Sequence, residues 1–501
     1  MKKSDGRTLA ILVVGGGTAG WIAATLMAQR WPWASVSVVE SPDIGIIGVG
    51  EGSTPQMKAL FRKLGVAERD WMPQCNATYK NGISFHGWSH APGCSSYFHP
   101  FPSPIDAHTA PAFAYHCFAR RRGVDLPARP DRFFLSAKLA ELRLAPVANR
   151  NFPFELAYGY HFDAFLVGKF LRQYAVSRGV SHIIGTVGRV DLNEAGEIAG
   201  LALDDGRRID ADLFVDATGF RGLLVQEAIG TPFRSFRENL FNDCAVVMPT
   251  ATGGDVLNAE TRSIAMTCGW RWDIPLTNRT GAGYVYASDF CSDDEAETEL
   301  RTALGLLDSD VEARRLKMKV GRVERHWTRN CLAVGLSQGF IEPLEATALH
   351  LVQATVESFM DNFEAGGFSN ARERAFNDDI NARFDGIRDY IVCHYRMSRR
   401  ADTEYWRANA ENDRLSDSLR SVFECWFSGG DMREEIRRQD IGRYYSDMSW
   451  QAMLSGYGRF PESLRPPEAA DQRFDIAVID DFIERSALNF RPHREALEFR
   501  A

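Results

Sequence analysis

Residues 8–20 read TLAILVVGGGTAG, an apolar run of strand length that leads directly into a glycine-rich turn. Residues 18–30 have helical composition, and SVSVVE at 35–40 is a second run rich in β-branched residues. The order strand, turn, helix, strand predicts a βαβ unit with parallel strands, and therefore an α/β fold built around a Rossmann-type core.

The turn carries the spacing GxGxxG at Gly15, Gly17 and Gly20. Gly15 permits the tight turn, Gly17 lets the backbone approach a pyrophosphate, and Gly20 lets helix and strand pack closely. Thr18 and Ala19 open the helix, where unpaired amides and the positive end of the helix dipole favour phosphate. A glycine-rich turn alone would be weak evidence, but strand and helix stand where a dinucleotide site requires them.

The acidic end of the second strand and two later segments specify the dinucleotide. Glu40 can accept hydrogen bonds from ribose hydroxyls. ADLFVDATGFRG at 211–222 resembles the DATG element of FAD-binding monooxygenases and reductases, and CLAVGLSQGFIEPLE at 331–345 resembles their late flavin-contacting segment. The three elements in this order favour FAD over NAD. We expect FAD contacts in the two later segments at Asp216, Gly335 and Leu344.

Between these elements, Asp163 is the predicted N-cap of a helix that ends at Gly179, and short strands with turns at 193–196 and 204–206 follow. No second strand is followed by GxGxxG. The chain is therefore expected to lack a nicotinamide domain, and a separate NAD(P)H-dependent flavin reductase is expected to supply the reduced flavin, FADH2.

Composition restricts the classes of binding partner that we expect for this protein. A net charge of −8 argues against nucleic acid or an anionic membrane, because such binding needs clustered Lys and Arg. The 9 cysteines include no CxxC pair, so we expect no metal site and no disulfide framework. The start of the chain resembles a signal peptide only superficially, and no stretch reaches the ~18 apolar residues that span a bilayer. We expect a cytoplasmic monomer or homodimer.

The segment GWRWDIPL contains Trp270, Trp272, Ile274 and Pro275, the pattern WxWxIP. With GGGTAGW, this pattern is similar to that of the flavin-dependent halogenases, including the tryptophan halogenases, over roughly residues 8–365. The two tryptophans lie on one face of an extended segment, where the alternative is a pair of core residues. The resemblance implies instead a gating role, as a barrier between flavin and substrate.

Lys80, in ATYKNGISFHGW, would not stand out from sequence alone, because an isolated lysine is usually a solvated surface residue. Its position matches the catalytic lysine of the halogenases. Such a lysine can hold hypohalous acid as an ammonium, or attack it as a neutral amine to give a haloamine. The sequence leaves both alternatives open.

The resemblance implies a carboxylate partner at Glu345, in EPLEATAL, near the start of a predicted helix. Its implied role is to polarise the halogenating species or to accept the ring proton, which is general-base work. An acidic residue that merely complements the helix dipole is the plainer explanation. Glu342 is an alternative, but the PLE register favours Glu345.

The amides of Thr347 and Ala348 begin the same helix, and the resemblance implies that they bind the chloride or bromide beside the flavin. Here Ala346 replaces the family's serine and Ala348 its glycine. Both changes keep the amides, so halide binding is retained, while the loss of a hydroxyl at 346 allows a different halide preference.

The segment GIIGVGEGSTPQMKALFRKLG at 45–65 resembles the halogenase strap near the flavin, and we expect Gly50 and Ser53 to contact the cofactor. A glycine-rich connector is the alternative. His99 and Phe101, in YFHPFPSP, match the family residues that flank the aromatic substrate.

Beyond residue 393 the chain is predicted to be mainly helical, which divides it into an FAD-binding and halogenation core at 1–392 and a helical substrate-side subdomain at 393–501. Trp450 is a predicted substrate contact. Tyr444 and Tyr445 are further candidates, and the spacing of all three differs from the pattern that grips the amino-acid end of tryptophan. Indole, or a larger indole-like or phenolic compound, is therefore favoured over free tryptophan as the substrate.

The resemblance implies that reduced FAD, oxygen and chloride or bromide give hypohalous acid, which reaches Lys80, where the aromatic ring takes the halogen with help from Glu345. Two rivals remain at this stage. A conventional FAD-dependent monooxygenase would hydroxylate its substrate, and a non-catalytic FAD-binding protein would form no product.

Overall fold

A computed structural model describes residues 8–45, 51–251, 256–461 and 473–498 of the chain. It divides into two compact units, each made of three separate stretches of sequence. The first unit comprises Met1–Asn76, Phe162–Arg237 and Met318–Asp385, and the second comprises Ala77–His161, Glu238–Lys317 and Gly386–Ala501.

The first unit is built on a six-stranded sheet in the order β21-β22-β13-β1-β2-β9. Its strands are parallel except for the edge strand β21, which is antiparallel to β22. The inner strands are almost entirely apolar because helices cover such a sheet. The predicted Rossmann-type α/β core is confirmed. The strands are β1 (Ala10–Val14), β2 (Ser35–Glu40), β9 (Ser181–Ile184), β13 (Leu213–Asp216), β21 (Trp327–Thr328) and β22 (Cys331–Ala333).

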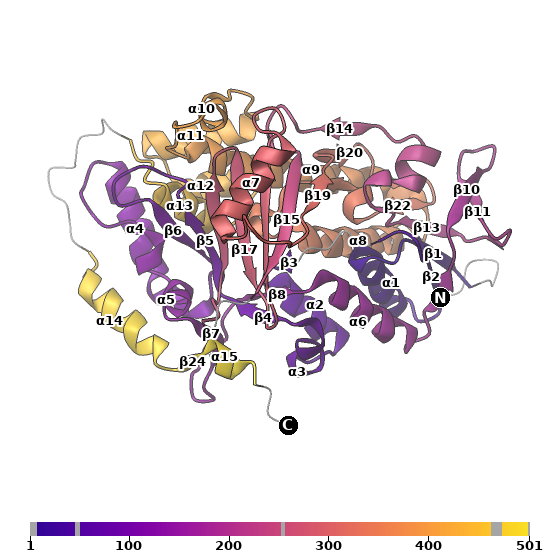
Figure 1. Ribbon diagram of the computed structural model, residues 1–501, viewed down its shortest axis with the longest axis horizontal. Helices are drawn as coiled ribbons and strands as arrows, with labels where there is room; N and C mark the ends of the chain where they lie inside the picture. Colours follow the sequence, from indigo (N-terminus) through magenta and orange to yellow (C-terminus); the bar gives the residue numbers. More distant parts are fainter. Residues whose placement is uncertain (1–7, 46–50, 252–255, 462–472, 499–501) are drawn as a thin grey trace. The chain divides into compact units, whose positions relative to one another are not determined.

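Helix α1 (Thr18–Arg30) packs against α6 (Ala164–Val176) and α8 (Ala348–Ala365) in this unit (Figure 1). Thr18 Oγ1 donates a hydrogen bond to the Ala164 carbonyl oxygen at 3.1 Å. Asp163 caps α6 as predicted, because its carboxylate accepts from the Leu166 amide at 3.2 Å. The remaining helices that start in this unit are α2 (Gln56–Leu64), α3 (Glu68–Trp71) and α9 (Glu373–Met397).

Two small antiparallel sheets complete the first unit. In one of them the predicted turns at 193–196 and 204–206 join the strands, with Gly196 and Gly206 at positive φ of 73° and 87°. Its apolar side packs on the core around Leu201 and Phe214, which are fully buried. The sheets consist of β10 (Val187–Leu192), β11 (Ile198–Leu203) and β12 (Arg208–Ile209), and of β14 (Phe233–Ser235), β20 (Gly321–Val323) and β23 (Gly339–Phe340), and β3 (Glu51–Gly52) is a further short strand.

The second unit contains a seven-stranded sheet in the order β19-β15-β18-β17-β16-β5-β6, antiparallel throughout except for the β16–β5 pair. Helix α7 (Asp293–Leu304) packs on β15 and β18 (Figure 1). The strands are β5 (Gly82–His86), β6 (Ser96–Pro100), β15 (Cys244–Thr250), β16 (Thr261–Met266), β17 (Gly269–Pro275), β18 (Thr280–Tyr286) and β19 (Arg314–Lys317).

After residue 393 the chain is mainly helical, as predicted, and most of these helices start at a side-chain cap. Thr403, Ser416, Asp431 and Ser446 each accept a hydrogen bond from an amide of the following first turn. Residues 393–501 lie in the second unit with 77–161 and 238–317. The structure thus groups residues 393–501 with two earlier stretches of the chain, and a separate domain that begins at residue 393 stays a prediction. The helices are α10 (Glu404–Glu411), α11 (Asp417–Ser428), α12 (Met432–Arg438), α13 (Asp447–Gly456), α14 (Ile476–Ala487) and α15 (His493–Ala496).

The second unit also contains the following elements: α4 (Ala110–Arg121), α5 (Leu135–Glu141), β4 (Thr78–Lys80), β7 (Leu144–Ala148), β8 (Gly159–Phe162) and β24 (Phe490–Pro492).

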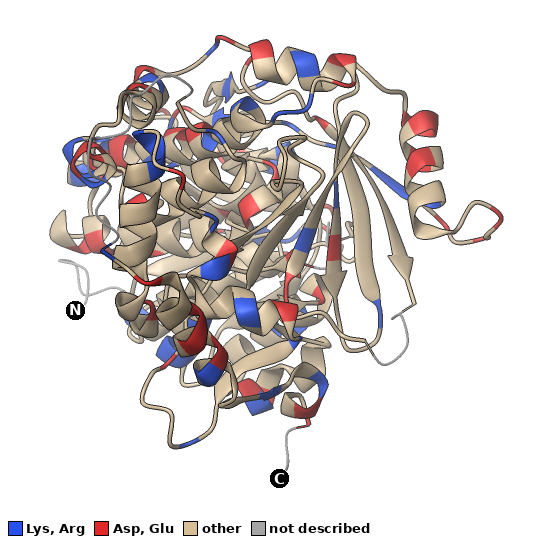
Figure 2. Cartoon of the chain, turned by 90° about the vertical axis from the view of Figure 1, so that its left-hand side faces the viewer, with Lys and Arg blue, Asp and Glu red and all other residues tan. Residues whose placement is uncertain are grey.

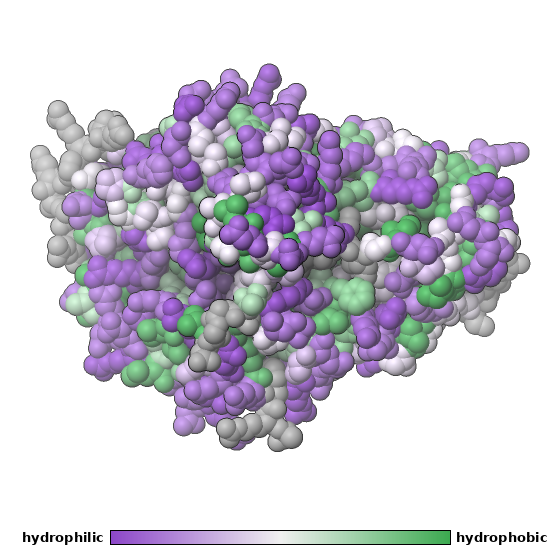
Figure 3. Space-filling view, viewed as in Figure 1, coloured by the Kyte–Doolittle hydropathy of each residue, from purple (hydrophilic) through white to green (hydrophobic). Residues whose placement is uncertain are grey.

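In Figure 2, basic and acidic residues are interspersed along the elements in view. In Figure 3, apolar residues form small separate patches among polar ones on the visible face. In the described part of the chain, every helix is too short or too polar to span a bilayer.

Candidate active site

The carboxyl ends of four parallel strands meet at one edge of the first unit's sheet. The Gly15 amide donates to the Val39 carbonyl at 2.9 Å, and the Ala217 amide donates to the Val14 carbonyl at 2.8 Å. The Val334 amide continues the series by donating to the Asp216 carbonyl at 2.9 Å. The GxGxxG turn, Glu40, the DATG loop and the late segment therefore share one edge, where open α/β sheets bind their ligands.

The glycines of the turn differ in what surrounds them. A Cβ on Gly15, at φ +113°, would lie 2.2 Å from the Ala217 carbonyl oxygen, and one on Gly20 would lie 2.0 Å from the Gly15 carbonyl oxygen. A Cβ on Gly17 would meet nothing within 4 Å. Gly15 and Gly20 are thus required by the fold, whereas Gly17 leaves open space at the start of α1, which fits the approach of a pyrophosphate.

Glu40 lies against the glycine turn at the end of β2. A Cβ on Gly16 would be 2.2 Å from the Glu40 carboxyl carbon. Glu40 Oε2 lies 2.9 Å from His182 Nε2 and 3.8 Å from Arg172 NH1. These two neighbours fix the carboxylate beside the turn, where the ribose of a dinucleotide lies in this type of site.

The Asp216 carboxylate organises the DATG loop. It is fully buried and accepts hydrogen bonds from the Thr218 amide and hydroxyl at 3.0 and 2.7 Å. Its other oxygen accepts from the Leu224 and Val225 amides, both at 2.8 Å. Burial raises the pKa of Asp216, and these hydrogen bonds oppose that rise. Through them, the carboxylate holds the loop in place.

The late segment approaches the same helix start. Gly335 has φ +68°, and a Cβ there would lie 2.8 Å from the Ala19 Cβ. Leu344 and Ser53 are both buried. Gly50 lies outside the described residues. Desolvation and, to a smaller extent, the Asp163 carboxylate together raise the pKa of the neighbouring Glu51 to about 7.

The predicted helix start at Glu345 has an irregular lead-in. Pro343–Glu345 form a single 3₁₀ turn, and Ala346 adopts a left-handed conformation with φ 54°. Thr347 is the N-cap of α8 and its side chain makes no cap hydrogen bond, so the first amides of the helix have no side-chain cap. Glu342 and Glu345 are both buried, at 1% and 3% exposure, so burial does not choose between them.

In the second unit, Lys80 ends strand β4 and is fully buried. Its Nζ lies 5.6 Å from the centroid of the Phe101 ring, within range of a cation–π interaction. The structure thus brings together two residues that were predicted from separate segments. Glu345 belongs to the first unit, so its meeting with Lys80 stays a prediction.

A buried polar chain, which the sequence did not reveal, supports the Lys80 strand. Thr78 Oγ1 donates to the Pro275 carbonyl oxygen at 2.6 Å and lies 3.1 Å from His161 Nδ1. His161 Nε2 lies 2.9 Å from Thr261 Oγ1. Burial lowers the pKa of His161 well below its usual value, and the charge of Lys80 lowers it further. A neutral imidazole therefore lies near the lysine, and Thr78 ties its strand to the WxWxIP proline.

Trp270 and Trp272 are both buried on strand β17, with ring centroids 6.0 Å apart. Trp272 lies opposite Gly283 on β18, where a Cβ would come within 2.2 Å of the indole ring. The neighbouring strand therefore makes room for one ring. Their gating role stays a prediction.

The predicted substrate residues His99 and Trp450 lie in an aromatic cluster around Tyr390. Tyr390 itself was not among the predicted site residues. The Tyr390 ring stacks on Tyr445 with centroids 3.5 Å apart and lies edge-on to Trp450 at 4.7 Å. Tyr390 Oη lies 3.4 Å from His99 Nε2. The available signal was the aromatic spacing in RDYIVCHYRMS, which places several rings on one helix.

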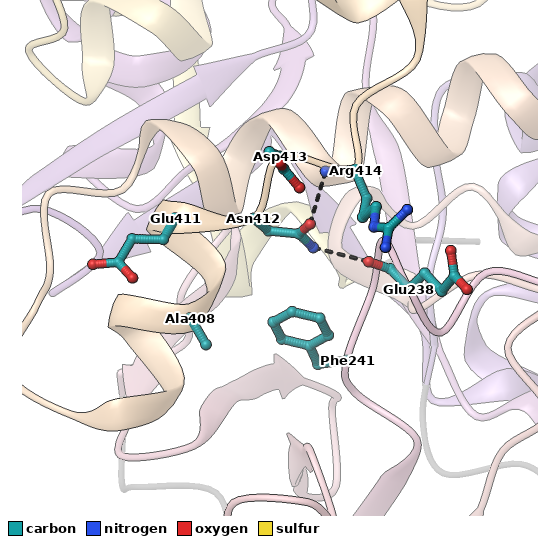
Figure 4. Close-up of a pocket in the computed structure, with 7 residues that line it drawn as sticks. All are labelled: Glu238, Phe241, Ala408, Glu411, Asn412, Asp413 and Arg414. Carbon is teal, nitrogen blue, oxygen red and sulfur yellow. Dashed lines mark hydrogen bonds between the residues drawn. The ribbon is translucent and has the colours of Figure 1, made fainter.

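A pocket of about 430 Å³ opens elsewhere in the second unit (Figure 4). Phe241 lines it together with the acidic side chains of Glu238, Glu411 and Asp413, and the Asn412 amide donates to the Glu238 carbonyl at 2.9 Å. None of the residues predicted for the flavin, halide or substrate lines this pocket. We assign it no role in the chemistry. Among the described residues, no cluster of side chains suits a metal ion.

The profile of the family described as Tryptophan halogenase matches residues 10–472. The chain belongs to this family. Relatives of the tryptophan halogenase family include the 7-chloro-L-tryptophan 6-halogenase of Kutzneria sp. (strain 744), 38% identical over 487 residues that cover 92% of each chain. The crystal structure of a tryptophan 6-halogenase from Streptomyces toxytricini superposes with a TM-score of 0.85 at 32% identity, covering 97% of this chain and 99% of that one.

A second solved structure, described as a flavin-dependent halogenase from Brevundimonas sp. BAL3, superposes with a TM-score of 0.82 at 31% identity, covering 98% of this chain and 99% of that one. These findings confirm the halogenase class and a flavin cofactor. The hydroxylase alternative is not favoured.

Proposed function

We propose that this enzyme halogenates the indole ring of its substrate, with Lys80 as the residue that holds the halogenating species. One observation carries the proposal: Lys80 is fully buried on β4 with its Nζ 5.6 Å from the Phe101 ring. A lysine is almost never fully buried unless its charge is compensated, because burial of a charge is costly, so a buried lysine is a candidate for a functional role. Here it faces an aromatic ring, next to the kind of surface on which a flat substrate stacks.

The cofactor that fits the first unit is FAD, supplied reduced by a separate NAD(P)H-dependent flavin reductase. The open space at Gly17, the Glu40 carboxylate and the ordered DATG loop are suited to its pyrophosphate, ribose and flavin ends. Bound reduced flavin supplies, with oxygen, the oxidation of chloride or bromide to hypohalous acid. The amides of Thr347 and Ala348 at the start of α8 would hold the halide.

Lys80 would donate a hydrogen bond to the hypohalous oxygen and orient the halogen toward the ring carbon. Glu345, also buried, would accept the proton that the ring carbon releases. Trp270 and Trp272 would limit passage between the flavin and substrate regions. We place the reaction in the cytoplasm, since the described structure pairs none of its cysteines in a disulfide.

The proposed substrate carries an indole rather than another aromatic ring, because the two relatives named above are described as halogenases of 7-chloro-L-tryptophan and of tryptophan. His99, Phe101 and Trp450 would contact its faces and edge. Whether the amino-acid end is required is an experimental question: turnover of indole and of free tryptophan, compared at equal concentration, distinguishes a ring-only site from one that grips the ammonium and carboxylate.

Lys80→Met tests the proposal, because methionine keeps an unbranched side chain, shorter than lysine by the one terminal nitrogen. The variant should lose at least ~100-fold of its bromination rate with flavin reductase, NADH, FAD and bromide, and should keep its flavin affinity. Product mass spectrometry gives the rate and also separates an added bromine from an added oxygen.

Lys138→Met is the matched control, since Lys138 is a partly exposed lysine of the same unit, paired with Glu141 at 3.1 Å. It should brominate at the parent rate. Substantial bromination by Lys80→Met, or hydroxylated product from the parent enzyme, would remove the basis for the proposed function.

A further inference from the structure

Two cysteines of the second unit lie side by side, although they are separated by 22 residues in sequence. Cys268 is in the turn between β16 and β17, and Cys291 immediately precedes the N-cap of α7. Cys268 Sγ lies 3.4 Å from the carbonyl oxygen of Phe290, the residue immediately before Cys291. Cys291 Sγ donates to the Ser292 carbonyl oxygen at 3.3 Å, so both thiols lie against the same stretch of backbone, residues 290–292.

The surrounding contacts hold the two segments together. The Thr267 amide and hydroxyl donate to the Glu299 carboxylate of α7 at 2.9 and 2.7 Å. The Cys268 amide donates to Tyr284 Oη at 2.8 Å, and its carbonyl accepts from the Ala287 amide at 3.1 Å. The turn and the start of α7 are therefore fixed on either side of the sulfur pair, so the two thiols stay close without a covalent bond.

The pair is also polarised and accessible. The neighbouring Cys291 side chain lowers the pKa of the Cys268 thiol, against the opposing effects of burial and of Glu299 and Glu295. Cys268 in turn raises the pKa of the Cys291 thiol. Cys268 is buried, whereas Cys291 is partly exposed, so a small oxidant can reach the pair. A thiolate beside a thiol is the arrangement that reacts with oxidants and then forms a disulfide.

We propose that Cys268 and Cys291 form a redox-active dithiol that captures small oxidants, hypohalous acid or hydrogen peroxide, and becomes an internal disulfide. This goes beyond the proposed function, because it assigns the enzyme a second site for the oxidants that such chemistry releases. The site lies in the turn before β17, two residues before Trp270, so it protects a part of the fold that carries oxidisable indole rings.

The reaction balances with these oxidants alone. The Cys268 thiolate attacks the halogen of hypohalous acid, forming a sulfur–halogen bond and releasing hydroxide. The Cys291 sulfur then attacks Cys268 sulfur, forming the disulfide and releasing halide and a proton. The net change converts two thiols and one hypohalous acid into a disulfide, water and hydrogen halide, so the sulfurs lose two electrons to the halogen. With hydrogen peroxide the intermediate is a sulfenic acid, and two waters are released.

The test adds the oxidant directly, so its result does not depend on turnover. The full-length protein is treated with one equivalent of hydrogen peroxide, and separately of hypobromous acid, then alkylated and digested without reduction. We expect a peptide that joins Cys268 to Cys291, reversed by dithiothreitol, and loss of both free thiols at least ~10-fold faster than loss of Cys94. Cys94 is a suitable reference because it is also partly exposed, and no thiol is among the groups that shift its pKa.

Cys268→Ser and Cys291→Ser should each abolish the joined peptide and leave the remaining cysteine to form higher oxyacids, while Cys94→Ser should behave as the parent. Near-isosteric serine keeps the fold, which circular dichroism checks. Separate oxidation of the two cysteines without a joined peptide, or a rate no faster than that of Cys94, would overturn the proposal.

Discussion

Asp216 is a single residue that stabilises the DATG loop through its side-chain hydrogen bonds. Its two carboxylate oxygens accept four hydrogen bonds, two from Thr218 and one each from the Leu224 and Val225 amides. Asp216→Asn replaces one acceptor oxygen by an NH2 group that cannot accept, so two of the four bonds are lost. We expect the free energy of unfolding to fall by about 1–3 kcal/mol and the flavin dissociation constant to rise at least ~10-fold.

Chemical denaturation and titration of flavin fluorescence measure the two effects. Asp210→Asn is the control, since Asp210 is an exposed residue paired only with Arg208 on the surface. It should leave both quantities unchanged. If Asp216→Asn bound flavin as the parent does, the loop would not depend on this carboxylate.

Among the elements, the first turn of α1 contains one glycine that the fold requires and another that flavin binding requires. Gly17 has ordinary φ of −73° and open space at its Cβ position, whereas Gly20 faces the Gly15 carbonyl oxygen at 2.0 Å. Gly17→Ala should therefore lower the melting temperature by no more than ~2 °C, since the poorer N-cap costs only about 1 kcal/mol and the methyl group meets no other atom. It should weaken flavin binding at least ~10-fold, because the methyl group occupies the path of the pyrophosphate.

Gly20→Ala is the matched comparison, with the same change three residues along the helix. It should lower the melting temperature by several degrees, because the methyl group cannot fit against the Gly15 carbonyl. Scanning fluorimetry and flavin titration of both variants give the answer. Equal loss of stability in the two variants would contradict the distinction.

The strength of the sequence signal differs between elements for physical reasons. The predicted runs at 35–40 and 18–30 coincide with β2 and α1, because buried parallel strands and their helices are strongly patterned. The first strand begins two residues later than the apolar run suggested. The left-handed Ala346 was unpredictable, since alanine does not favour that conformation and only its surroundings impose it.

For the whole molecule, the sequence predicted the Rossmann core and the later helices but not how the chain alternates between two units, because that depends on contacts between distant segments. The residues of the candidate site likewise differ in how far the sequence alone predicted them. Glycine spacing predicts the flavin end on physical grounds, whereas Lys80 became a candidate only through resemblance. The Thr78–His161 chain left no local pattern, since its members come from separate strands. The aromatic spacing around Tyr390 was a local signal, but it did not show which distant rings this residue contacts.

Buried histidines occur in both units and make the stability of the whole molecule depend on pH. An unfolded histidine has a pKa of about 6.5. In the folded protein, burial lowers the pKa of these residues to about 3 or about 4, so below pH ~6.5 the unfolded chain binds more protons than the folded one. They are His326 and His394 at about 3, and His86, His350 and His493 at about 4.

Acidification should therefore lower the melting temperature progressively from about pH 6.5 toward pH 4, with each histidine contributing up to ~1.4 kcal/mol per pH unit. Carboxyls with a raised pKa act in the opposite sense, because their protonation favours the folded state; among them are Glu51, with a pKa of about 7, and Asp106, with a pKa of about 6. The five histidines each contribute across the whole of this range, so we expect the net slope to be destabilising. Scanning fluorimetry across this range measures it, and His86→Gln should flatten the slope. A melting temperature that stayed constant or rose on acidification would mean that these imidazoles take up protons in the folded protein.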